Sequence, residues 1–122
     1  MQWRVDFHPR FAIEFRELAG PVQDEILALV EVLTIAGPRM KRPRCDTLSG
    51  STHANMKELR FEADDGVWRV AFAFDPARRA ILLTAGDKSG VSKQRFYKTL
   101  ITKADTRFDE HLEALKKSGK SP

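Results

Sequence analysis

The chain has 122 residues, 42% of them hydrophobic and 31% charged, with a formal net charge of +4. These values predict one soluble domain, and the mild positive charge suits a phosphate-bearing or acidic partner without requiring one. A single cysteine excludes an intramolecular disulfide, no run approaches the ~18 apolar residues of a membrane span, and no apolar signal-peptide segment opens the chain. We therefore expect a cytoplasmic protein with no membrane association. The three histidines lack ligand spacing, so we also expect no structural zinc site and no cofactor.

The first part of the chain predicts a short strand followed by two helices. Residues 3–7 alternate between apolar and polar side chains, which is typical of a strand, here at a sheet edge. Pro9 suits the first turn of a helix, and a break at Gly20 starts a second helix whose apolar stripe ends at Gly37. Residues 39–54 show no apolar period and predict a loop, and loops longer than about 12–15 residues are usually functional or mobile.

The stretch 57–88, KELRFEADDGVWRVAFAFDPARRAILLTAGDK, predicts a three-stranded antiparallel meander. Its three apolar runs have the period of two and the β-branched and aromatic content of strands. Turn signals at 64–66 (Asp-Asp-Gly) and 75–76 (Asp-Pro) separate them. If Leu59, Phe61, Val70, Phe72 and Phe74 face the core, alternation turns Arg60 and Arg69 to the opposite face, on neighbouring strands.

A long amphipathic helix is predicted from Ser92 to about Lys117, with Ser92 as its N-cap. Residues 118–122 are expected to form a frayed tail. The order of the expected helices and strands along the chain predicts a single α+β domain over residues 1–117. In it, an antiparallel sheet (the N-terminal strand plus the meander) is packed by the N-terminal helix pair and the long C-terminal helix.

Four segments together resemble the RelE/HigB superfamily of toxins from bacterial type II toxin–antitoxin modules, and in particular its phage-derived HigB-like branch. They are KELRF (57–61), WRVAFAFDP (68–76), AILLTAGDKSG (80–90) and RFYKTLITKADTRFDEHL (95–112). The resemblance extends from Val5 to about Leu115. It implies a RelE-like fold and an endoribonuclease that cleaves mRNA, usually in the A site of the 70S ribosome. It also implies a helix-turn-helix antitoxin that neutralises the toxin.

Metal-independent RNA cleavage, in which the 2′-OH attacks the scissile phosphate, needs a base, an acid and cations around the reacting phosphorus. Arg60 and Arg69 are candidates for the cations, because arginine stays charged and binds phosphate oxygens bidentately. Lys88, at the end of the third meander strand, is a candidate base if neighbouring cations lower its pKa. Tyr97 and His53 are the other candidates for proton transfer.

Lys57, Lys93 and Arg95 are expected to extend the cationic surface and to bind substrate. Each assignment has a plainer alternative: His53 as a solvated loop histidine, Lys88 as a turn lysine, and Tyr97 as part of the core. The chain also lacks the dense C-terminal run of basic and aromatic residues that many RelE-type nucleases carry after the last strand. The identity of the acid and the base therefore stays open.

Two other functions stay open at this point. Relatives of the ParE type share the fold but inhibit DNA gyrase and cleave no RNA. A basic RNA-binding domain without toxicity is the other alternative. Cations grouped on one face of the sheet favour the nuclease.

Overall fold

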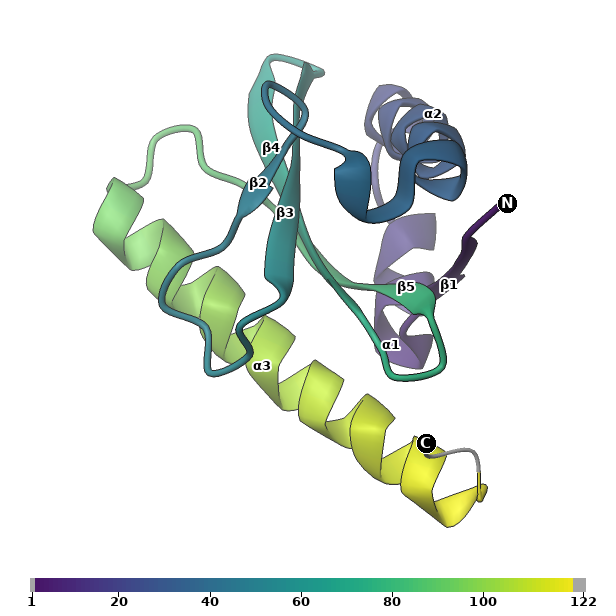
Figure 1. The fold of residues 1–122 in the computed structure, drawn as a ribbon. Helices are drawn as coiled ribbons and strands as arrows, with labels where there is room; N and C mark the ends of the chain where they lie inside the picture. Colours follow the sequence, from purple (N-terminus) through teal and green to yellow (C-terminus); the bar gives the residue numbers. More distant parts are fainter. Residues whose placement is uncertain (1, 120–122) are drawn as a thin grey trace.

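The computed structural model of the chain describes residues 2–119. Its elements follow the predicted order of strand, helix pair, meander and long helix (Figure 1). In chain order they are β1 (Arg4–Phe7), α1 (Pro9–Arg16), α2 (Gly20–Ala36), the 3₁₀ helix η1 (Gly37–Arg39), β2 (Cys45–Thr47), β3 (Met56–Ala63), β4 (Gly66–Phe74), β5 (Arg79–Asp87) and α3 (Lys93–Lys117).

The strands form one open five-stranded sheet in the order β1-β5-β4-β3-β2. The predicted antiparallel meander is confirmed as β3, β4 and β5, and β2 adds to its β3 edge in antiparallel fashion. β1 lies at the opposite edge, as predicted, but it pairs parallel with β5. The sheet is therefore mixed and not wholly antiparallel. Most of the chain separates β1 from β5, so no tight hairpin imposes an antiparallel pairing on them.

One strand lies inside the stretch 39–54, which the sequence predicts as a loop. This strand, β2, is only three residues long, too short to show a period of two. Its first residue, Cys45, is buried and pairs with Leu59 of β3, while polar residues flank it on both sides. The prediction of an unstructured loop is therefore wrong for these three residues.

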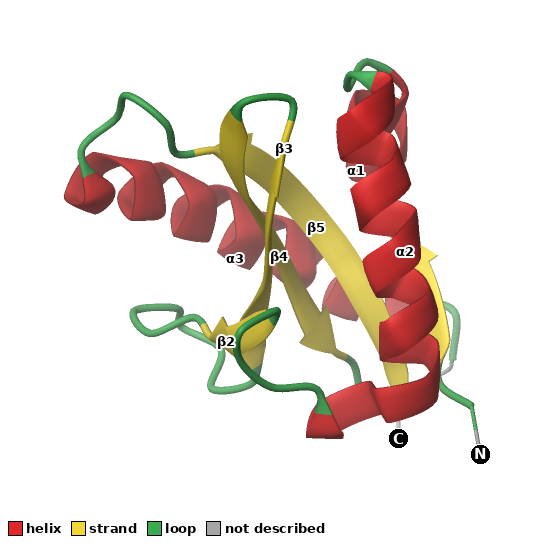
Figure 2. Cartoon of the chain, turned by 90° about the horizontal axis from the view of Figure 1, so that it is seen from above, coloured by secondary structure: helices red, strands yellow, loops and turns green. Residues whose placement is uncertain are grey.

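Helices cover both faces of the sheet (Figures 1 and 2). The helices α1 and α2 pack on the face that presents Leu59 and Val70, which confirms the predicted core face of the meander. The opposite face carries a second core, where α3 packs on Ala71, Leu83 and their neighbours. Arg60 and Arg69 belong to this second face, so they lie beside a packed helix and not on an open surface.

Local signals fix the ends of these elements. Asp64 and Asp65 have positive φ values of 53° and 60° between β3 and β4, the conformation of a two-residue hairpin turn that Asp tolerates. The side chain of His8 accepts a hydrogen bond from the backbone N–H of Arg10 at the start of α1. Ser92 caps α3 in the same way, through a 3.3 Å bond from the backbone N–H of Arg95.

The end of α3 matches the prediction. The helix ends at Lys117, and the backbone N–H of Ser118 still donates to the carbonyl of Ala114 at 3.0 Å. The remaining part of the predicted tail, residues 120–122, lies outside the described residues. Within the described part of the chain, no helix is both long enough and apolar enough to cross a membrane.

Candidate active site

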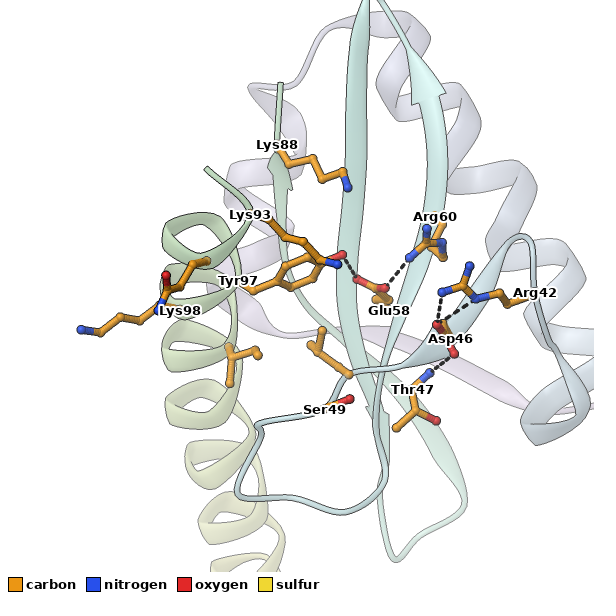
Figure 3. Close-up of a pocket in the computed structure, with 13 residues that line it drawn as sticks. Arg42, Asp46, Thr47, Ser49, Glu58, Arg60, Lys88, Lys93, Tyr97 and Lys98 are labelled. Atoms are coloured by element: carbon orange, nitrogen blue, oxygen red, sulfur yellow. Dashed lines mark hydrogen bonds and ion pairs between the residues drawn. The ribbon is translucent and has the colours of Figure 1, made fainter. Parts of the chain in front are cut away.

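A groove of about 790 Å³ opens between β2, β3 and the N-terminal half of α3 (Figure 3). Tyr97 and Gln94 of α3 form part of one wall. The charged side chains in its lining are five cations (Arg42, Arg60, Lys88, Lys93 and Lys98) and two carboxylates (Asp46 and Glu58). Both carboxylates are paired with arginines, so the groove presents net positive charge to a ligand.

A buried carboxylate organises the floor of the groove. The side chain of Glu58 is only 4% exposed, and both of its oxygens accept hydrogen bonds (Figure 3). Arg60 Nη1 donates to Oε2 at 2.7 Å, and the hydroxyl of Tyr97 donates to Oε1 at 2.9 Å. One glutamate of β3 therefore fixes a guanidinium group and a phenol from two different elements.

Arg69 lies beneath this pair with a side chain that is 6% exposed. Its Nε donates to the Tyr97 hydroxyl oxygen at 3.2 Å and lies 3.8 Å from Glu58 Oε1, while its Nη1 donates to the carbonyl of Trp68 at 2.9 Å. Arg60 and Arg69 are direct cross-strand partners in the register of β3 and β4. Like charges in such a pair repel each other, and Glu58 between them offsets the repulsion.

The surroundings shift two pKa values in opposite directions. Burial lowers the pKa of the Lys88 ammonium, and the charges of Arg69, Arg60 and Lys93 lower it further. Burial raises the pKa of the Tyr97 phenol; the hydrogen bond from Arg69 opposes this change, and the hydrogen bond to Glu58 adds to it. Near neutral pH Tyr97 therefore keeps its proton, while Lys88 releases its proton more readily than an ordinary lysine.

The structure brings five of the predicted site residues together. Arg60, Lys88, Lys93 and Tyr97 line the groove, and Arg69 is bonded to Tyr97 beneath it. Together they place guanidinium and ammonium donors around one hollow, the arrangement that binds phosphate oxygens. Within residues 2–119, no three His, Cys, Asp or Glu side chains are grouped so as to hold a metal ion.

Three predicted residues lie elsewhere. His53 follows β2 in a loop that turns toward the middle of α3, where its Nε2 bonds to Asp109 Oδ1 at 2.8 Å. Lys57 alternates with Glu58 along β3, so its side chain points to the other face of the sheet. Arg95 lines a separate hollow on the far side of α3. None of the three is among the residues that line the groove.

Sequence reasoning missed Glu58, Arg42 and Lys98. For Glu58 a signal existed, because a residue two positions before Arg60 in a strand shares its face. Arg42 stands in the polar stretch before β2 and reaches the groove through its ion pair with Asp46, at 2.8 Å. Lys98 is one of several exposed lysines of α3, and only the packing of the helix on the sheet places it at the groove.

The fold is that of the RelE class of toxins. The chain superposes on a free variant of the Escherichia coli toxin RelE with a TM-score of 0.61 and 14% sequence identity, over 84% of this chain and 97% of RelE. It also superposes on RelE from the RelE–RelB complex of Pyrococcus horikoshii OT3, with a TM-score of 0.53 and 16% identity, over 75% of this chain and 100% of that one. At these identities the likeness shows the fold alone.

The chain belongs to the family described as "Phage derived protein Gp49-like (DUF891)", whose model matches residues 13–109, and through it to the RelE/HigB superfamily of toxins. It is 48% identical over 111 residues to the candidate toxin HigB2 of Mycobacterium tuberculosis (strain ATCC 25618 / H37Rv), a match that spans 90% of this chain and 54% of HigB2. It is 45% identical over 87 residues to the candidate toxin HigB3 of the same organism, spanning 71% of this chain and 74% of HigB3. The chain thus matches about half the length of HigB2.

Proposed function

We propose that this chain is the toxin of a type II toxin–antitoxin module and that it arrests translation by cutting mRNA. The observation that carries the proposal is the Glu58 network. A buried carboxylate fixes Arg60 and Tyr97, with Arg69 beneath them, at the floor of a groove whose free charges are cationic. Such a groove fits a phosphodiester, and family membership supports RNA as its source.

In the proposed reaction the 2′-oxygen attacks the neighbouring phosphorus and the bond from phosphorus to the 5′-oxygen breaks. Lys88, in its neutral form, takes the proton from the 2′-OH. The hydroxyl of Tyr97 turns from Glu58 toward the departing 5′-oxygen and gives its proton to it. The products are a 2′,3′-cyclic phosphate and a free 5′-OH, and the two protein groups exchange their protons with solvent afterwards. The lowered pKa of Lys88 enlarges the fraction of neutral amine, and the raised pKa of Tyr97 keeps the phenol protonated.

The arginines act on the charge that develops at phosphorus. The phosphorane carries more negative charge than the bound diester, so preorganised cations stabilise it selectively. Arg60 is partly exposed in the groove and is placed to bind the phosphate oxygens. Arg69 donates to the Tyr97 oxygen, where it stabilises the phenolate that remains after proton transfer. No metal ion takes part in this scheme.

The partners of the proposed function are an antitoxin and the translating ribosome. The archaeal RelE to which the fold is similar was solved with RelB bound, which supports a protein partner for this chain also. An antitoxin neutralises the toxin if it covers the cationic groove or holds the toxin off the ribosome. The ribosome would present a single mRNA strand, whose unpaired 2′-OH can reach the groove.

Induction in a bacterial host without an antitoxin tests the function. We expect translation to stop within minutes for the wild type and to continue for Lys88→Met. Lys116→Met removes the same charge from the far end of α3 and serves as the matched control that should stay toxic. A DNA-damage response with intact mRNA would indicate a gyrase inhibitor instead of a nuclease. Normal growth on induction of the wild type would indicate a non-toxic binding domain.

A further inference from the structure

A second basic surface lies on the outer side of α3. A hollow of about 490 Å³ runs along the helix there, bounded by Arg10 of α1 and Arg107 of α3. Between them α3 presents Lys98, Thr102 and Lys103. Every residue in the lining is an arginine, a lysine or a threonine, so the hollow has hydrogen-bond donors and no carboxylate of its own.

The two arginines of this hollow are already paired. Arg10 is hydrogen-bonded to the carboxylate of Glu110, and Arg107 donates to Glu14 at 2.8 and 2.5 Å. These pairs join α1 to α3 and explain both arginines as structural residues. The lysines differ, because within residues 2–119 no ion pair joins Lys98 or Lys103 to a carboxylate. Their charges are the ones that a ligand would neutralise.

The hollow continues the active-site groove, because Lys98 lines both. Lys98 and Thr102 are four residues apart and lie on one exposed side of α3, with Lys103 next to them. From Lys93, at the groove, to Lys103 the helix rises about 15 Å. Ammonium and hydroxyl donors therefore follow one another along a path that begins at the proposed site of cleavage.

We propose that Lys98, Thr102 and Lys103 bind the phosphate backbone of the substrate RNA where the strand leaves the groove. The inference rests on the proposed function, since it takes the groove as the place where RNA is cut. A flexible polyanion suits a surface made of hydrogen-bond donors and of lysines that form no ion pair within residues 2–119. The hollow itself is lined by arginine, lysine and threonine side chains, which suits a polyanion better than the apolar anchoring side chain of a protein segment.

The test is the salt dependence of RNA binding, measured by fluorescence anisotropy with a labelled 2′-O-methyl oligonucleotide that the protein cannot cut. Each phosphate contact contributes about 0.7 to the slope of log affinity against log salt for a single strand. We expect Lys103→Gln to reduce the slope by about that amount. Lys116→Gln, which removes an exposed lysine beyond the hollow, should leave the slope of the wild type. Equal slopes for Lys103→Gln and the wild type, or an equal loss in both variants, would overturn the proposal.

Two further measurements distinguish a failure of this inference from a failure of the proposed function. Suppose that the wild type cuts unmodified mRNA on the ribosome but that Lys103→Gln binds the oligonucleotide with an unchanged salt dependence. The proposed RNA contacts along α3 are then wrong, while the proposed nuclease activity is retained. If the wild type neither binds nor cuts RNA, both fail. If Lys103→Gln weakens binding of the antitoxin and leaves RNA binding unchanged, the surface belongs to a protein partner and the proposal is overturned.

Discussion

The hydroxyl of Tyr97 donates a 2.9 Å hydrogen bond to Glu58 Oε1 and so joins the first turns of α3 to the middle of β3. The two residues are 39 positions apart in the chain, and Glu58 is buried. The same carboxylate holds Arg60 through its other oxygen, so the aromatic and cationic parts of the groove share one support. The proposed chemistry depends on this support, because a misplaced phenol or guanidinium would no longer meet the reacting phosphate.

Glu58→Gln tests the support itself. The amide keeps the shape of the carboxylate but removes the charge that compensates Arg60 and Arg69. Breaking a buried ion pair in this way costs roughly 3 kcal/mol, so we expect a loss of about that size in the free energy of unfolding. Urea denaturation followed by circular dichroism measures it.

Glu62→Gln is the matched control for that experiment, because Glu62 lies on the same strand and is exposed. Its free energy of unfolding should stay within about 0.5 kcal/mol of the wild type. If Glu58→Gln has the same unfolding midpoint as Glu62→Gln, then Glu58 does not hold the floor of the groove together.

Tyr97→Phe removes only the hydroxyl that the mechanism uses as the proton donor. We expect the rate of RNA cleavage to fall by a factor of about 10² to 10⁴, the usual contribution of general acid catalysis. The fold should persist with a loss of about 1–3 kcal/mol, since the bond to Glu58 and the bond from Arg69 are both removed. Single-turnover cleavage together with urea denaturation separates the two effects, and a variant with wild-type rate would remove Tyr97 from the reaction.

The pH dependence of cleavage tests Lys88 as the base. Its neutral form rises with pH, and its pKa is lowered, so the rate should rise with pH and level off below the ordinary lysine value of about 10.4. The measurement uses a short RNA at saturating protein, with a metal chelator present. In Lys88→Arg the charge is permanent, so we expect a low rate without this rise. If the rate of Lys88→Arg rises with pH as that of the wild type does, the titrating group is a residue other than Lys88.

A second network, at the other end of the sheet, predicts acid sensitivity. Asp75 is buried and accepts bonds from His111 Nε2 at 2.7 Å and from the backbone N–H of Arg79 at 2.9 Å. Burial raises the pKa of Asp75, but the bonds from His111 and Arg79 outweigh burial, so the pKa is lowered overall. The ionised carboxylate therefore adds stability above the unfolded-state pKa of about 3.9, and this stability is lost as the pH falls below it.

Asp75→Asn should accordingly lower the free energy of unfolding by about 3 kcal/mol at pH 7, and the difference from the wild type should shrink below about pH 4. Denaturant titrations at a series of pH values measure both quantities. Asp24→Asn, at an exposed position of α2, is the control that should change little. A difference that stays constant from pH 7 to pH 3 would exclude Asp75 as the titrating group.

Alternation along strands carried most of what the sequence could predict about the site. It predicted that Arg60 and Arg69 share a face, and the register of β3 and β4 confirms this by pairing them directly. The same rule, applied to every residue of β3, includes Glu58 and excludes Lys57. The directions of these two side chains could therefore be predicted from the sequence, because a strand without a bulge fixes the direction of each side chain.

The rest depends on contacts between distant segments. His53 precedes β3 by only three residues, and its nearness to the meander in the sequence made it a candidate for proton transfer. Its loop is instead fastened to α3, where Asp105 accepts bonds from the Ser51 hydroxyl at 2.5 Å and the Thr52 backbone N–H at 3.0 Å. The parallel pairing of β1 is also set at long range, and neither feature leaves a local pattern in the sequence.

Primer extension on mRNA after induction, with the wild type and Tyr97→Phe at equal protein levels, tests the central claim most directly. New 5′ ends should appear within coding regions for the wild type within minutes. They should be absent or strongly reduced for Tyr97→Phe, which remains folded. Growth arrest by the wild type with intact mRNA would contradict the proposed nuclease, and equal cleavage by both proteins would contradict the site.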